Sequence, residues 1–125
     1  MKVKVIYPSD GSHEKSRIEF EVDVPNVVGA GKPDHEYLLG RAWRQANFVE
    51  DTDLERFRDY GKQNGVPMIR SAMVGDIFII EDVPYVCDSV GWYKLEPKAI
   101  ELWAKLPSTE RLMGVKWCLE KRETL

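Results

Sequence analysis

The amino-acid sequence predicts an α+β fold, in which a mostly antiparallel sheet of about five strands carries an αα-hairpin and a further helix packed on one face. Three patterns predict it. Apolar and charged residues alternate near the N-terminus, apolar residues then recur at helical spacing, and an unbroken apolar run followed by a hairpin pattern occupies the second half. The 125 residues contain no internal repeat, low-complexity tract or linker. We therefore expect residues 1–125 to form a single domain.

The first two predicted elements are strands over 2–7 and 17–24. In both, apolar residues alternate with charged residues, as in a strand with one buried and one solvent-facing side. Turn-forming residues lie between them and Pro25 closes the second strand, so an antiparallel hairpin is expected. The glycine-containing segment 26–33 is interpreted as a connecting loop, because it lacks the Ser or Thr that follows Gly-Lys in a phosphate-binding loop.

Two helices are predicted next. The first covers about 34–47, with Asp34 as its N-terminal cap. The second covers about 53–63, where Thr52 and Glu55 match a capping box and Gly65 provides a stop. Because the link between them is short, the pair is expected to form an αα-hairpin.

The second half returns to strands. The apolar run 77–80 predicts a strand buried on both faces, Glu81 and Asp82 are expected to reverse the chain, and further strands are expected at 83–87 and 92–95. Apolar spacing then predicts a helix over 97–106 and a helical turn over 108–112. The last apolar residues alternate with period two, which predicts a final strand over 114–121.

The charge balance and the cysteine content limit the class of protein. There are 18 Lys and Arg residues against 21 Asp and Glu residues, a net charge of −3, which disfavours strong non-specific binding to nucleic acid. The N-terminus lacks a signal-peptide pattern, and no stretch is apolar enough for a membrane helix. Cys87 and Cys118 form no CxxC pair and are expected to be reduced thiols. A cytoplasmic protein that does not associate with membranes is expected.

Catalytic and metal-binding patterns are weak. A Cys87–His35–Asp88 arrangement would supply a nucleophile, a base and an orienting carboxylate, but no sequence signature supports it. The acidic residues between 50 and 55 stand at a helix start, where negative charge is favourable without any ligand. We therefore expect no enzyme activity, no metal site and no cofactor.

Arginines and aromatic residues on the helix pair form the first candidate binding surface. The arginines are Arg41, Arg44, Arg56 and Arg58, interleaved with Trp43, Phe57 and Tyr60. Single-stranded nucleic acid and protein partners are both bound by such residues. Five acidic residues between 50 and 59 largely neutralise this region, so a solvated surface of ion pairs is the leading interpretation and a partner surface the next.

The hairpin end offers a second candidate surface. Trp92 and Tyr93 follow Gly91, and one of the two side chains must point outward. Tryptophan and tyrosine contribute strongly to protein interfaces. The acidic residues Glu81, Asp82 and Asp88 could instead present carboxylates in place of phosphates to a nucleic-acid-handling enzyme.

Residues 70–95 resemble a known group of proteins. The run Arg70-Ser71, Val74-Gly75-Asp76, a hairpin and then Cys87-Asp88-Ser89-Val90-Gly91-Trp92 is similar to a stretch of small phage- and plasmid-encoded proteins that include YodL-like domains. The chain departs from that pattern at Ala72-Met73 and at Val83-Pro84, where a glycine usually makes the turn. The resemblance implies an accessory product of a phage or mobile element.

These observations favour a non-enzymatic interaction protein that binds and modulates a host protein or nucleoprotein complex, such as a defence system. The first alternative is a nucleic-acid or nucleotide binder that uses the helix-pair arginines. The second is a small cysteine-dependent enzyme built on Cys87. A homodimer is also possible, formed by pairing of exposed strands at 2–7 or 114–121.

Overall fold

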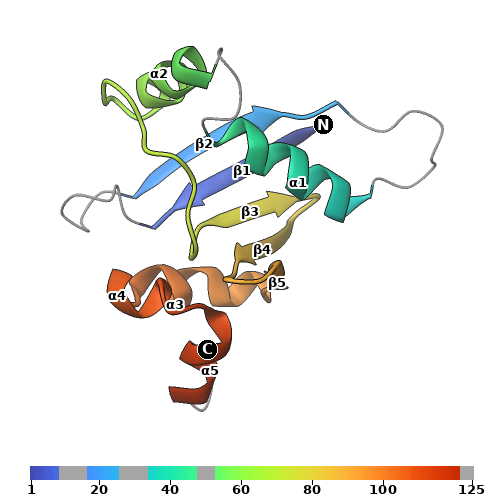
Figure 1. Cartoon of the computed structure of the whole chain (residues 1–125), viewed down its shortest axis with the longest axis vertical. Coiled ribbons are helices and arrows are strands. Elements are labelled where there is room, and N and C mark those ends of the chain that lie inside the picture. The colour runs from blue at the N-terminus through green and yellow to red at the C-terminus, as the bar shows by residue number, and fades with distance from the viewer. Residues whose placement is uncertain (9–16, 26–33, 48–52, 122–125) are drawn as a thin grey trace.

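A computed structural model describes residues 1–8, 17–25, 34–47 and 53–121 of the chain. Figure 1 shows one open sheet with helices around it, which confirms the α+β class. The sheet has five strands in the order β2-β1-β3-β4-β5. The strands are β1 (Lys2–Tyr7), β2 (Ile18–Asp23), β3 (Ile77–Ile80), β4 (Val83–Cys87) and β5 (Trp92–Lys94). The helices are α1 (His35–Gln45), α2 (Asp53–Gln63), the 3-10 turn η1 (Pro97–Ala99), α3 (Ile100–Lys105), α4 (Ser108–Arg111) and α5 (Val115–Lys121).

The strand order explains where the first two helices lie. β1 pairs antiparallel with both β2 and β3, so β2 and β3 run parallel to each other on either side of it. Parallel strands need a crossover connection, and α1 and α2 belong to that crossover. Both helices lie on the same face of the sheet, α1 over the central strands and α2 beside β2 (Figure 1).

The core under α1 and α2 follows from the alternation in the first two strands. Val3, Val5 and Tyr7 of β1 face this side, with Phe20 and Val22 of β2. Leu38, Leu39, Ala42 and Ala46 of α1, and Phe57 and Tyr60 of α2, cover them. The sequence prediction of an N-terminal hairpin with one buried side is therefore confirmed.

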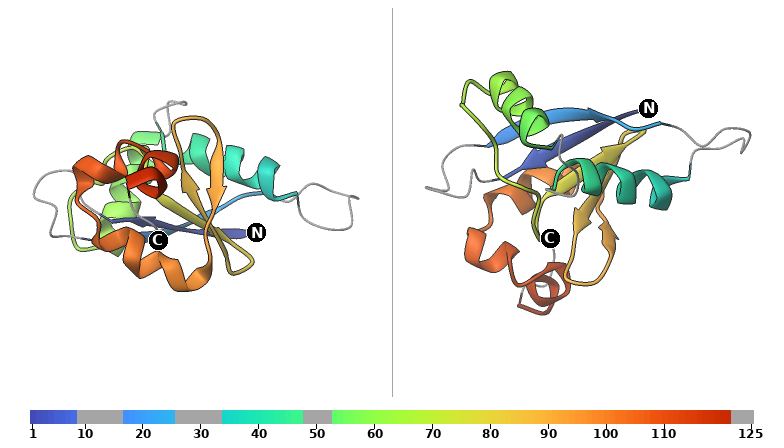
Figure 2. Two further views of the ribbon diagram at one scale, coloured as in Figure 1. Left: turned by 90° about the horizontal axis from the view of Figure 1, so that it is seen from below. Right: turned by 45° about the horizontal axis from the view of Figure 1, so that its top comes forward.

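The helices cover both faces of the sheet, whereas the sequence predicted one. Ile6, Ile77 and Val86 point to the second face and pack with Trp103 of α3 and with Val115 and Cys118 of α5. Figure 2 shows α1 and α3 on opposite sides of the strands. The run Ile77–Ile80 is buried on both sides, as predicted, and its second side needs this second layer of helices.

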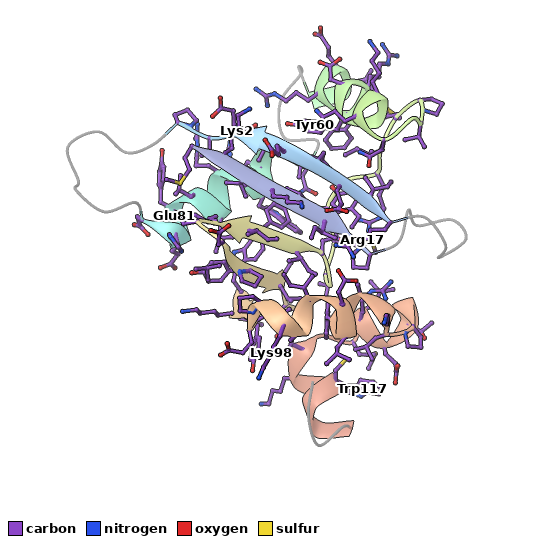
Figure 3. All side chains as sticks on the ribbon, turned by 180° about the vertical axis from the view of Figure 1, so that it is seen from behind. Lys2, Arg17, Tyr60, Glu81, Lys98 and Trp117 are labelled. Atoms are coloured by element: carbon purple, nitrogen blue, oxygen red, sulfur yellow. The ribbon has the colours of Figure 1, made fainter. Side chains whose placement is uncertain are left out.

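The second face is covered only in part. Figure 3 shows Lys2 and Arg17 at opposite ends of the uncovered strands β1 and β2, with Arg17 next to α3. Lys4 Nζ lies 3.0 Å from Glu19 Oε1 across the open strands β1 and β2. Arg17 donates to both carboxylate oxygens of Glu101, at 2.8 and 3.0 Å, and so connects the start of β2 to α3.

The ends of α1 and α2 agree with the sequence. Asp34 caps α1 by accepting a hydrogen bond from the Tyr37 N–H at 3.2 Å. Gly65 has a φ of 71° just beyond α2, the left-handed conformation of a helix stop. Thr52 and the link 48–52 lie outside the described residues, so the predicted capping box is outside them too.

The C-terminal segment corrects the prediction of a strand over 114–121, because it forms helix α5. Val115 and Cys118, three residues apart, are buried against the second face of the sheet. Asp88 Oδ1 accepts a hydrogen bond from the Val115 N–H at 3.3 Å and so caps the first turn of the helix. A cap supplied by a residue 27 positions away cannot be read from local alternation.

The strand order also corrects the predicted routes to a homodimer. Residues 2–7 form an interior strand with neighbours on both sides, and 114–121 is helical. The edges of the sheet are β2 and β5. Among the described residues, no helix has the length and apolar character needed to cross a membrane.

Candidate functional site

Three of the four predicted arginines surround one hollow of about 550 Å3 between α1, α2 and the β2 edge. We call this the arginine hollow. Arg41 and Arg44 come from α1, and Arg56 comes from α2. Its other lining residues are Glu21, Asp23, Pro25, Gln45, Asp59, Tyr60 and Gln63. The fold thus brings together side chains that are far apart in the sequence.

Helical spacing explains which arginines line the arginine hollow. Arg41 and Arg44 are three residues apart and share a side of α1, and Arg56 and Asp59 share a side of α2. Arg58 follows Arg56 by two residues, is exposed and does not line the arginine hollow. Tyr60, labelled in Figure 3, packs its ring on Phe20 of β2 with 4.6 Å between the ring centroids, and this contact holds α2 beside the sheet.

The charges in the arginine hollow are mixed. Three carboxylates, those of Glu21, Asp23 and Asp59, line it together with the three arginines. Arg41 and Arg44 are exposed and form no ion pair with another described residue. Such a surface offers donors and acceptors to a partner that carries both signs of charge.

The two predicted aromatic residues at the hairpin end, Trp92 and Tyr93, point to opposite sides of β5. Trp92 is partly buried and packs edge-to-face on Phe78 and Trp43, with ring centroids 5.0 and 6.0 Å apart. Tyr93 points to the other side of β5 and is 39% exposed. Of the two, Tyr93 is therefore the outward-facing residue.

The three predicted acidic residues lie at opposite ends of β4. Glu81 and Asp82 form the tight turn before it, with positive φ angles of 49° and 66°. Asp88 follows the strand, roughly 20 Å away at about 3.3 Å per residue. It accepts hydrogen bonds from the Ser89 and Val115 N–H groups. The three carboxylates do not form one phosphate-like cluster.

Sequence reasoning missed a hydrogen-bonded array at the start of α1. His35 Nδ1 lies 2.7 Å from the Tyr85 hydroxyl, and His35 Nε2 lies 2.8 Å from Glu81 Oε1. Burial, and then the Glu81 charge, raise the pKa of Tyr85. A proton on Nε2 lets Tyr85 donate to the ring while the ring donates to Glu81. Both ring nitrogens are thus engaged, and the array fastens α1 to the β3–β4 turn.

The possible catalytic arrangement of Cys87, His35 and Asp88 does not form. His35 is engaged by Tyr85 and Glu81, and the Cys87 thiol donates to the Asp88 backbone carbonyl at 3.7 Å. Burial, with Asp76 and Asp88 nearby, raises the pKa of Cys87 to about 12, which opposes formation of a thiolate. Cys87 and Cys118 are both buried, and neither forms a disulfide bond.

Residues of the segment 70–95 have structural roles. Arg70 pairs with Asp76 through two hydrogen bonds of 2.8 Å, and the Arg70 guanidinium carbon lies 4.0 Å from the Tyr7 ring centroid. The Gly75 carbonyl accepts from the Trp103 indole at 2.8 Å. These contacts connect the segment to the cores on both faces of the sheet.

No group of three or more His, Cys, Asp or Glu side chains within the described ranges could hold a metal ion. Comparisons of the chain with protein-family models, with curated proteins and with solved structures found no match.

Proposed function

We propose that this chain is a non-enzymatic binding protein that attaches to a protein partner through the arginine hollow. The observation that carries the proposal is the convergence of Arg41, Arg44 and Arg56 from two helices on one hollow. Arginine is enriched among the residues that dominate binding energy at protein interfaces. The two exposed arginines of α1 are available to pair with carboxylates of a partner.

The mixed charge of the arginine hollow favours a protein partner over nucleic acid. A phosphate backbone would be attracted by the arginines and repelled by Glu21, Asp23 and Asp59 in the same lining. The net charge of −3 adds to that repulsion. A protein surface with charges of both signs can complement the hollow.

The resemblance to phage- and plasmid-encoded proteins supports a more specific form of the proposal. In it, the chain is a phage or mobile-element accessory factor in the host cytoplasm, and the partner is a host protein or nucleoprotein complex such as a defence system. The edges β2 and β5 leave a homodimer as a further arrangement for this factor.

A matched set of arginine variants tests the proposed function. The double variant R41A/R44A should reduce retention of the partner from host lysate at least about tenfold, because hot-spot truncations cost roughly 2 kcal/mol or more. R58A removes an exposed arginine of α2 outside the hollow and should retain the partner. Equal losses in both variants would contradict a role for the hollow.

The nucleic-acid alternative predicts a different result from a salt titration. An arginine-based nucleic-acid site should bind oligonucleotides at low salt and lose affinity steeply as salt rises. The proposed protein-binding function predicts no oligonucleotide binding at low salt. Steeply salt-dependent binding that R41A/R44A abolishes would replace the proposal with this alternative.

A further inference from the structure

A second hollow, of about 250 Å3, lies between α1 and the turn that joins β4 to β5. We call it the tryptophan hollow. It is lined by Gly40, Trp43, Cys87, Asp88, Gly91 and Trp92. Its volume is below the roughly 300–1,000 Å3 of small-molecule pockets, so its size suits a single side chain better than a cofactor.

The two indoles give the tryptophan hollow two walls that differ in direction. The Trp43 and Trp92 rings pack edge-to-face, with their centroids 6.0 Å apart and an interplanar angle of 85°. Trp92 also packs against the buried Phe78, with ring centroids 5.0 Å apart. Aromatic walls set at an angle are suited to a cation, because each ring face carries partial negative charge.

Asp88 adds a carboxylate to the same lining. One of its oxygens, Oδ1, accepts the hydrogen bonds from the Ser89 and Val115 N–H groups. Within the described part of the chain, no ion pair neutralises this carboxylate, and the lining contains no Lys or Arg. The hollow therefore has negative charge and aromatic surface but no cation of its own.

Gly40 lines the edge of the tryptophan hollow without adding a side chain to it. It stands in the middle of α1, where glycine is less favourable than alanine by roughly 0.5–1 kcal/mol. A Cβ atom built at this position would have no atom within 4 Å, so no close packing requires a glycine there. The missing side chain leaves space beside Trp43.

We propose that the tryptophan hollow binds an arginine side chain of a protein partner. The guanidinium would lie against the indole faces and donate to Asp88, which combines a cation–π contact with a charge-assisted hydrogen bond. The assignment of this arginine to a protein partner rests on the proposed function. The binding chemistry of the hollow can be tested without any partner.

The test uses N-acetyl-arginine amide as the probe and NMR of the four tryptophan indole N–H signals as the readout. The Trp43 and Trp92 signals should shift and saturate at millimolar probe. The Trp103 signal should not move, because this indole is buried on the other face of the sheet and bonded to Gly75. N-acetyl-citrulline amide has nearly the same shape without the charge and should cause no saturating shift.

Two variants locate the binding. D88N keeps an oxygen that can accept from the Ser89 and Val115 N–H groups but removes the charge, and it should weaken probe binding at least tenfold. G40L places a side chain at the edge of the tryptophan hollow and should abolish binding. D82N, at an exposed acidic residue outside the hollow, should bind as the unmodified protein does. An unchanged Trp103 signal verifies that each variant is folded.

Several results would overturn the inference. These are no saturating shift with the arginine probe, equal shifts with the citrulline probe, or undiminished binding by D88N. Saturation by a nucleoside without saturation by the arginine probe would identify a base-stacking slot and would also reject it. All of these results leave the arginine-hollow variants unaffected, so failure here is distinguishable from failure of the proposed function.

Discussion

The carboxylate of Asp76 is 2% exposed and accepts hydrogen bonds from two nitrogens of Arg70 and from the Met73 N–H. Burial raises the pKa of Asp76, and the Arg70 guanidinium opposes that rise. The sequence indicated only that Gly75 and Asp76 follow a turn. The partner of Asp76 could not be predicted, because a buried ion pair depends on the packing around it.

Replacing Asp76 by Asn should destabilise the protein by roughly 3–5 kcal/mol, because the mostly buried Arg70 charge loses its carboxylate. The free energy of unfolding in urea measures the effect. D82N, at an exposed acidic residue of the β3–β4 turn, is the matched control and should change stability by less than about 0.5 kcal/mol. A loss below about 1 kcal/mol in D76N would contradict the structural role of the pair.

The raised pKa of Cys87 predicts slow thiol chemistry. In a C118S background, roughly 10³-fold less thiolate is expected at pH 7 than for a free cysteine, given a pKa of about 12 for Cys87. Iodoacetamide should therefore react slowly, and the rate should rise about tenfold per pH unit below that pKa while the fold persists. Reaction of the folded protein at the rate of the urea-unfolded protein would show that Cys87 is an accessible, reactive thiol.

At the scale of elements, the sequence predicted best those segments whose burial is local. The alternation of apolar and charged residues predicted β1 and β2. Capping residues and a terminating glycine in the sequence predicted α1 and α2. The prediction of a final strand was wrong because Asp88, which serves the start of α5, is remote in the sequence. The second helical layer was missed for the same reason, since its contacts join α3 and α5 to distant strands.

Substitutions at two glycines, Gly114 and Gly40, test the contact between Asp88 and the start of α5. Gly114 has a φ of 94°, and a Cβ at this position would collide with Asp88 Oδ1, so G114A should destabilise the protein by more than about 1 kcal/mol. Gly40 has open space around its Cβ position within α1, so G40A should stabilise by roughly 0.5–1 kcal/mol. Thermal unfolding of both variants measures the difference. Equal effects would contradict the close contact between Asp88 and the start of α5.

At the scale of the whole molecule, α1 stands between the two hollows. Arg41 and Arg44 line the arginine hollow on one side, and Gly40 and Trp43 line the tryptophan hollow on a neighbouring side. The sequence supplied the residue types of both sites but not their grouping. The sequence could not show that Arg56 lines the arginine hollow while Arg58 does not, or that Trp43 and Asp88 line the same hollow. These positions depend on the crossover from β2 to β3.

The central claim is that a protein partner contacts the arginine hollow, and site-specific photo-crosslinking in host cells tests it most directly. Gln63 lines this hollow, whereas the adjacent, exposed Lys62 does not. A photoreactive residue at position 63 should give a discrete, nuclease-resistant protein adduct that R41A/R44A removes and R58A retains, and one at position 62 should give none. No adduct at 63, equal adducts at both positions, or an adduct only to nucleic acid would contradict the claim.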